Sequence, residues 1–194
     1  GNTGMVLKVT AADDITNKKT INVSGSSNIG MRVDKGEVST DATGTPKAKN
    51  DGTININGGT TATKNMGMVA NGESEATNET AGKITLKNTG IGLLSTNSGT
   101  VDNKGTISGE NLDLAIGISV LANSKGTNTG TMKLSGTGVT GVYNEAGTFN
   151  MTGGSLEVSG DKSLGIYSKG NSTNTNVSGG TITASNGTVG LYAD

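Results

Sequence analysis

Carboxylates are the side chains of this sequence best suited to acid–base chemistry, because it contains no histidine and no cysteine. That composition excludes a Ser-His-Asp triad and a Cys-His dyad. General acid–base catalysis would then need paired carboxylates in a cleft. The only adjacent acidic pair is Asp13-Asp14, and alternation places its members on opposite faces if the segment is extended. The other charges are scattered, so we expect no catalytic residues and no enzyme activity.

The same composition predicts no metal site and no cofactor. Structural and catalytic zinc sites draw mainly on cysteine and histidine. No Gly-x-Gly-x-x-Gly segment precedes helix-forming sequence, which argues against a phosphate-binding loop. The Gly-Gly-x-Gly-x-Asp calcium repeat is also missing.

Tyrosine is the residue type whose spacing indicates binding. Tyr143, Tyr167 and Tyr192 are all the tyrosines of the chain, and each follows a glycine–aliphatic pair. In successive coils they would stack about 5 Å apart on an outer face. We predict a partner-binding strip, since tyrosine offers contact area and a hydrogen bond to a protein or a sugar. The alternative is a structural ladder, in which the rings stabilise neighbouring coils.

The glycine–aliphatic pair itself recurs along the whole chain. Successive steps are 26, 37, 25, 25, 24, 24 and 25 residues. A fixed period of this length indicates an array of equivalent coils rather than one central core. The pairs are Gly4-Met5, Gly30-Met31, Gly67-Met68, Gly92-Leu93, Gly117-Ile118, Gly141-Val142, Gly165-Ile166 and Gly190-Leu191.

A second element of alternating polar and apolar residues precedes each glycine, as in Thr53-Ile54-Asn55-Ile56. This alternation is typical of a strand with one buried face. A third, weaker strand is marked by segments such as Thr100-Val101-Asp102. Three short strands fit into 24 or 25 residues, and parallel crossovers are nearly always right-handed. We therefore predict an all-β, right-handed parallel β-helix of about eight coils.

The alternation also predicts which side chains face inward. We expect the aliphatic residues on both sides of each glycine to face inward, the glycine to face outward, and all six methionines to lie on inward positions. An outward polar ladder is expected at Asn22, Asn55, Thr85, Ser108, Lys133, Glu157 and Thr183.

The 37-residue step interrupts the pattern. Residues 34–51 contain seven charged residues and Pro46, the only proline. We interpret 34–51 as a loop excursion from the helix wall, and residues 1–194 as one β-helix segment of a longer protein. Loops on a rigid scaffold often carry function, although a solvated spacer is the alternative.

The charge and composition of the chain exclude some classes of binding partner. The net charge is −1 and Arg32 is the only arginine, which argues against nucleic-acid binding. No apolar run is long enough to span a bilayer, so we expect no membrane insertion by this segment. The lack of cysteine permits an extracellular location without disulfides.

The repeat resembles the passenger regions of large type V autotransporter adhesins of Gram-negative anaerobes. The matching segments are Leu164-Gly165-Ile166-Tyr167-Ser168, Val189-Gly190-Leu191-Tyr192-Ala193 and Asn103-Lys104-Gly105-Thr106-Ile107. The resemblance implies a β-helix displayed at the cell surface, anchored through an outer-membrane β-barrel of the parent protein. It also implies adhesion to host cells or other bacteria, and it transfers no binding residue.

Three functions remain open from the sequence. The first is a segment of a cell-surface adhesin that binds a host or bacterial surface protein or glycan. The second is a non-binding stalk that presents another domain. The third and weakest is a polysaccharide-acting enzyme, which would need clustered charges on one outer column.

Overall fold

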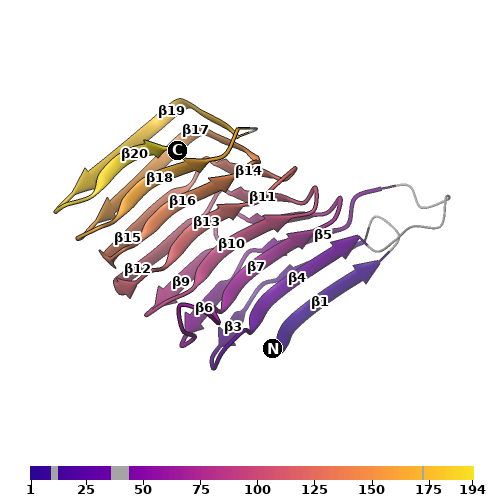
Figure 1. Ribbon diagram of the computed structural model, residues 1–194. Helices are drawn as coiled ribbons and strands as arrows, with labels where there is room; N and C mark the ends of the chain where they lie inside the picture. The colour runs from indigo at the N-terminus through magenta and orange to yellow at the C-terminus, as the bar shows by residue number, and fades with distance from the viewer. Residues whose placement is uncertain (10–12, 36–43, 172) are drawn as a thin grey trace.

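Twenty β-strands of the described residues wind into one parallel solenoid (Figure 1). The computed structural model describes residues 1–9, 13–35, 44–171 and 173–194, and no helix occurs among them. The two termini lie at opposite ends of the stack of coils. The predicted all-β parallel solenoid is confirmed, with three strands in each of the first five coils and two in each of the next two.

The first wall, sheet A, has eight parallel strands separated by seven turns of the solenoid. Each strand pairs in register with its counterpart one coil away; Leu93, for example, lies opposite both Met68 and Ile118. The strands are β1 (Thr3–Val9), β4 (Ile29–Lys35), β7 (Met66–Asn71), β10 (Ile91–Thr96), β13 (Ile116–Val120), β16 (Thr140–Glu145), β18 (Leu164–Lys169) and β20 (Val189–Ala193).

The second sheet, sheet B, has twelve strands and forms the other two walls. One ladder, B1, consists of β2 (Asp14–Asn17), β5 (Lys47–Asn50), β8 (Glu75–Asn78), β11 (Thr100–Asn103) and β14 (Lys125–Asn128). The other ladder, B2, consists of β3 (Thr20–Val23), β6 (Thr53–Asn57), β9 (Lys83–Lys87), β12 (Thr106–Asp113) and β15 (Thr131–Thr137).

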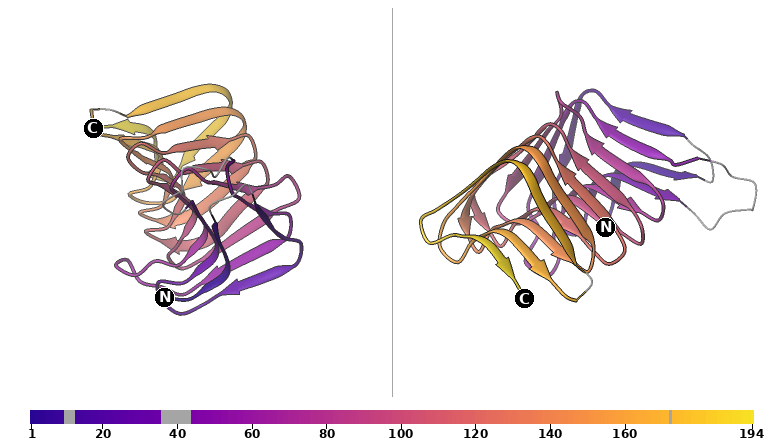
Figure 2. Two further views of the ribbon diagram at one scale, coloured as in Figure 1. Left: turned by 90° about the vertical axis from the view of Figure 1, so that its right-hand side faces the viewer. Right: turned by 90° about the horizontal axis from the view of Figure 1, so that it is seen from above.

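The two ladders of sheet B merge towards the C-terminus. Strand β17 (Thr148–Ser159) has 12 residues and pairs with both β14 and β15. Strand β19 (Asn174–Ser185) continues this long strand in the next coil. The stacked coils, with the long final strands in orange and yellow, are visible in Figure 2. A corner that separates B1 from B2 in the early coils is therefore opened into a continuous strand in the last two.

A ladder of buried asparagines fills that corner in the early coils. The members are Asn17, Asn50, Asn78, Asn103 and Asn128, each at most 5% exposed. The side-chain Nδ2 of each of the first four donates to the Oδ1 of the next member at 2.8 Å. The ladder ends where Met151 takes the position in register with Asn128, which is the coil where B1 and B2 merge. Hydrogen-bonded amide side chains thus occupy the corner in the coils where B1 and B2 are separate strands. An apolar side chain replaces them where B1 and B2 become one continuous strand.

The predicted outward glycines are wrong. A Cβ on Gly92 would point into the core, 3.1 Å from a methyl group of Ile107, and lie 2.5 Å from the carbonyl oxygen of Gly117. The following Leu93 is also fully buried, so two consecutive residues face inward and the strict alternation fails there. Gly30, Gly67, Gly117 and Gly141 have the same surroundings. Glycine recurs at this position because adjacent coils approach too closely for any side chain.

The core is a continuous column of aliphatic side chains through the solenoid. Met31, Met68, Met132 and Met151 are fully buried, and Met5 packs against the core. Met66 does not, which corrects the expectation that all six methionines face inward. Like Met66, the partly exposed Ile29, Ile91, Ile116 and Leu164 lie outside the core.

The expected polar ladder on B2 is confirmed. Its residues follow one another in register from Asn22 to Thr183, and none of them is buried. Asn55 donates a 2.9 Å hydrogen bond to Asn22, and Lys133 lies 3.3 Å from Glu157.

The expected excursion at 34–51 overlaps the wall at both ends, because Asp34 and Lys35 belong to β4 and residues 47–50 to β5. Both ends of that range are thus part of the wall, and residues 36–43 lie outside the described residues.

Candidate functional site

The three tyrosines lie in one column on the outer face of sheet A. Tyr143 in β16, Tyr167 in β18 and Tyr192 in β20 are in register. Their ring centroids are 5.5 and 5.3 Å apart, and the ring planes are inclined by 73° and 55°. Tyr143 and Tyr167 are partly exposed, and Tyr192 is 46% exposed. The structure thus brings the three residues together as the spacing predicts, and their binding role stays a prediction.

Polar contacts hold the tyrosine column in place. The hydroxyl of Tyr143 donates to Oε2 of Glu145 at 2.7 Å, and Nζ of Lys169 lies 3.0 Å from Oε1 of the same carboxylate. Burial, and then the hydrogen bond to Glu145, raises the pKa of Tyr143. Hydrogen bonds from Tyr143 and Lys169 lower the pKa of Glu145. The hydroxyl of Tyr167 reaches the carboxylate of Asp194 at 3.5 Å, a long contact.

Further apolar side chains extend the column toward the N-terminus. Leu94 and Val69 occupy the tyrosine position in earlier coils, with Ser119 between Leu94 and Tyr143. Val69 and Ser119 are only 3% exposed, each set between larger neighbours in register. The column before Tyr143 therefore holds apolar side chains at Val6, Val69 and Leu94, and it is interrupted by Arg32 and Ser119.

A second apolar column, which the sequence analysis missed, runs beside the first. It precedes the glycines, and its apolar members Ile29, Met66, Ile91, Ile116 and Leu164 are all partly exposed and not part of the core. Two threonines belong to the same column, Thr3 before Ile29 and Thr140 between Ile116 and Leu164. Alternation predicted inward positions for these residues because the two consecutive inward residues at each glycine were not foreseen. Together the two columns form an apolar strip, which we call the sheet A strip.

A third outer column borders the strip and is largely polar. Lys8, Asp34, Asn71 and Thr96 are in register, as are Glu145 and Lys169, and Leu121 and Asp194 directly follow the ends of β13 and β20. We call these eight residues the edge column. Within it, Asp34 is paired with Arg32, whose Nε lies 2.8 Å from Oδ2. The strip is therefore bordered by charges of both signs.

The carboxylates on the outer face of B1 lie next to lysines rather than next to each other. Lys49 contacts Asp14, Lys47 lies 2.7 Å from Glu75, and Lys104 lies 3.4 Å from Glu79. Both members of the pair Asp13-Asp14 are exposed, and Asp13 precedes β2. Among the described residues, no three His, Cys, Asp or Glu side chains are grouped so that they could hold a metal ion.

Asp102 is the carboxylate on this face with unusual surroundings. Its Oδ1 is buried without a hydrogen-bond partner among the described residues, and Lys104 lies 3.8 Å from Oδ2. Burial raises the pKa of Asp102, Lys104 opposes this, and Glu79 and Glu75 add to it. Within the described part of the chain, the charged group in contact with this carboxylate is Lys104, not a second carboxylate.

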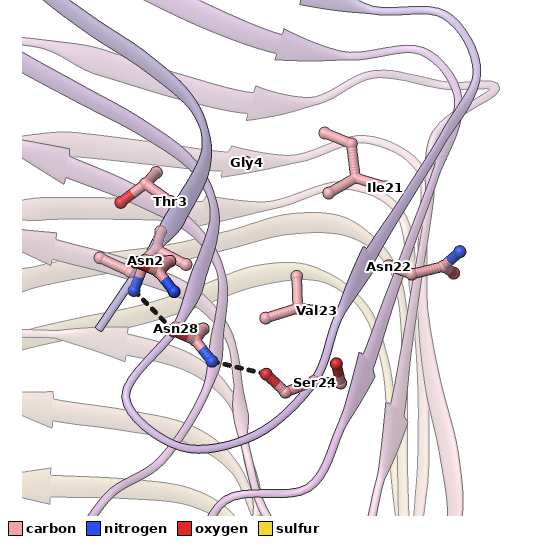
Figure 3. A pocket seen from close by; sticks show the side chains of 9 residues that line it. Asn2, Thr3, Gly4, Ile21, Asn22, Val23, Ser24 and Asn28 are labelled. Atoms are coloured by element: carbon pink, nitrogen blue, oxygen red, sulfur yellow. Dashed lines mark hydrogen bonds between the residues drawn. The ribbon is translucent and has the colours of Figure 1, made fainter.

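Shallow hollows occur on B2 and at the first coil. Two of about 300 and 320 Å³ adjoin on B2 and share Thr85 and Lys87. A third, of about 210 Å³, is lined by Asn2, Thr3, Ile21, Val23 and Asn28 among others. In Figure 3, Ile21 and Val23 point toward the interior and Asn22 points away from it, and dashed lines join Asn28 to Asn2 and to Ser24.

No helix of the described residues is both long and apolar enough to cross a membrane.

The parallel ladders, the stacked aliphatic core and the outer columns of side chains define this chain as a parallel β-helix protein. Residues 2–113 match the family model of the BigA third pectate lyase-like domain, and the chain belongs to this family. The match suggests a bacterial surface protein. No curated protein and no solved structure matches the chain.

The family membership supports part of the resemblance drawn from the repeat. It agrees with a β-helix segment of a bacterial surface protein. The autotransporter export route, the anaerobic source and the outer-membrane anchor stay predictions. The matched residues end before the tyrosine column, which begins at Tyr143.

Proposed function

We propose that this chain is a segment of a cell-surface adhesin that attaches the cell to host cells or to other bacteria. The observation that carries the proposal is the tyrosine column, three partly exposed aromatic rings in register on a rigid outer wall. Tyrosine is enriched at binding surfaces, because its ring gives contact area at low entropic cost. The wall and the bond between Tyr143 and Glu145 hold the rings in place before binding, which lowers that cost further.

The ring geometry favours a protein partner over a glycan. A sugar packs best on an aromatic face that is open to solvent. Here the planes of Tyr143 and Tyr167 are inclined by 73°, so the edge of one ring occupies the face of the next. The rings therefore present no common flat platform, whereas the neighbouring aliphatic side chains suit an apolar protein surface.

A non-binding stalk is the alternative, in which the rings only stabilise adjacent coils. A polysaccharide-acting enzyme is the weaker alternative, because the B1 carboxylates lie beside lysines. Catalysis is not part of the proposed function.

The test is binding of the labelled, folded chain to epithelial cells and to partner bacteria. We expect saturable binding that is lost in the triple variant Tyr143→Ala/Tyr167→Ala/Tyr192→Ala. The matched control is Thr131→Ala/Ser155→Ala/Thr181→Ala, which changes outward positions of B2 in the same region of the solenoid and should bind normally.

Unchanged binding by a well-folded triple tyrosine variant would show that the tyrosine column is not the binding site. No binding by the folded wild-type chain would favour the stalk. Circular dichroism and thermal unfolding of each variant separate a lost contact from a lost fold.

A further inference from the structure

We propose that the outer face of sheet A binds a second copy of this chain, in an antiparallel pair related by a two-fold axis parallel to the strands. This inference rests on the proposed function and deepens it, since it uses the same face and names a partner. It stands on three observations: the sheet A strip, the order of charges in the edge column, and the register that both columns share.

The strip gives the association its driving force. Ile91 and Ile116 lie at its centre in adjacent coils, both partly exposed, with Leu94 beside them. Burial of apolar area contributes about 25 cal/mol per Å². No described segment covers this face, so its apolar area is open to a partner.

Symmetry then determines which residues meet. A half-turn about an axis parallel to the strands brings each column onto the same column of the partner and reverses the order of the coils. Each of the two mainly apolar columns consequently meets itself. A half-turn about the solenoid axis would instead place the column of Ile29 against the edge column with its charges. The antiparallel arrangement is isologous, as most protein dimers are.

The charges of the edge column select one register. With the axis between the coils of β10 and β13, opposite charges meet at both ends of the interface. Lys8 meets Asp194. The largely buried Asp34, which is paired with Arg32 in its own copy, meets Lys169, which is paired with Glu145 in its own copy. Moving the axis by half a coil spacing toward the N-terminus would place Lys8 against Lys169, and Asp34 against Glu145. Moving it the other way would place Asp34 against Asp194. Both shifts bring like charges together, which disfavours them.

The other columns agree with this register. In the tyrosine column, the Arg32 guanidinium meets the ring of Tyr167, a favourable cation–π pair. The further pairings are Ile29 with Leu164, Ile91 with Ile116, Met66 with Thr140, Val69 with Tyr143, and Leu94 with Ser119. These pairings follow from the registers within one copy and need no change of backbone.

The size of the face sets the strength of the pair. Seven coil spacings of about 4.8 Å and five residues of about 3.3 Å give a footprint of roughly 34 by 17 Å, or about 600 Å² per copy. Interfaces of this size lie at the lower limit for stable complexes, so we expect a reversible dimer in the micromolar range. Weak contacts of this kind gain avidity when many copies face each other on two cells.

The experiment is sedimentation of the 194-residue chain over a range of concentrations. The wild type should form a reversible dimer, and Ile91→Glu should be a monomer because it places a charge at the centre of the strip. The matched control Thr131→Glu, on the exposed face of B2, should dimerise like the wild type.

Charge exchange tests the register with residues at the rim, which cannot disturb the core. Lys8 and Asp194 are both exposed. Lys8→Glu should weaken the dimer by up to about tenfold, because two symmetric contacts change sign. The double variant Lys8→Glu/Asp194→Lys should recover the wild-type affinity.

Monomeric wild-type protein at high concentration with intact β-structure would overturn the proposal. Association that persists in folded Ile91→Glu would also overturn it, and would indicate pairing of exposed strand edges instead. Failure to bind epithelial cells leaves this inference standing and contradicts a host receptor. Binding to those cells by a strictly monomeric chain would support a host receptor and overturn the proposed dimer.

Discussion

The side-chain Nδ2 of Asn103 donates to Oδ1 of Asn128 at 2.8 Å, and both residues are fully buried. Asn103 also accepts a 2.8 Å hydrogen bond from Asn78 in the preceding coil. An asparagine inside the ladder therefore uses both ends of its amide between coils, whereas Asn128 at its end has Met151 as its next neighbour. This difference between two otherwise equivalent residues makes the ladder testable.

We expect Asn103→Leu to destabilise the chain by about 2–4 kcal/mol, because it removes the 2.8 Å acceptor of the Asn78 amide and the 2.8 Å donor to Oδ1 of Asn128, both buried. Asn128→Leu should cost about half as much, since it interrupts the ladder on one side only. Urea unfolding followed by circular dichroism measures both. Equal losses for the two variants would contradict the account of the ladder.

The inward glycine column predicts a large effect from a single methyl group. In Gly117→Ala the added Cβ would lie 2.6 Å from the carbonyl oxygen of Gly141. Backbone cannot yield as a flexible side chain can, so we expect a loss of about 3 kcal/mol or more. The matched control is Gly153→Ala, where nothing lies within 4 Å of the added atom. A change within about 0.5 kcal/mol is expected there.

Asp102 predicts a pH-dependent stability of unusual sign. Burial raises its pKa, with Lys104 opposing this, so folding favours the protonated form. The charged carboxylate therefore destabilises the folded chain at neutral pH, and this cost disappears as the pH falls through the raised pKa. We expect Asp102→Asn to raise the melting temperature at neutral pH, with the gain shrinking in acid.

Lys104→Gln should lower the melting temperature at neutral pH, since it removes a charge that lowers the pKa of Asp102. Melting curves from neutral to acidic pH measure both variants. A constant gain for Asp102→Asn at every pH would show that titration of this carboxyl is not the cause.

Titration of the tyrosines tests the contact between Tyr143 and Glu145. Burial and the hydrogen bond to Glu145 raise the pKa of Tyr143 above its ordinary value near 10. Glu145→Gln removes the carboxylate, so the phenolate of Tyr143 should form at lower pH than in the wild type. Ultraviolet absorbance of phenolate against pH measures this, with Tyr143→Phe identifying which step belongs to Tyr143. Identical curves for wild type and Glu145→Gln would rule out the bond in solution.

Much of the fold could be predicted from the sequence, because a solenoid repeats its pattern in every coil. The period of the glycine–aliphatic pair and the alternation at segments such as Thr53-Ile54-Asn55-Ile56 gave the three strands per coil and the polar ladder of B2. The spacing of the three tyrosines placed them in one column. The edges of the 34–51 excursion were set too wide, since β4 and β5 extend into that range.

The errors have two physical sources. Strict alternation was applied through glycine, where the chain turns two consecutive residues inward, so Ile91 and Met66 were placed on the wrong side. The asparagine ladder was missed because asparagine was expected on outward positions, as at Asn22 and Asn55, and not in the interior. Its recurrence at Asn78, Asn103 and Asn128, 25 residues apart, was the available signal.

The direction of the hydrogen bonds between coils has a mechanical consequence. The bonds join each strand to its counterpart in the next coil, and the termini lie at opposite ends of the stack. A pull between the two ends would load these bonds along their own direction and open them a few at a time, starting at an end. Each coil of about 25 residues that detaches would add roughly 80 Å of extended chain. Single-molecule stretching should therefore show many small force steps rather than one large rupture. A tether built in this way lengthens under load, so less force reaches the binding contact at its far end.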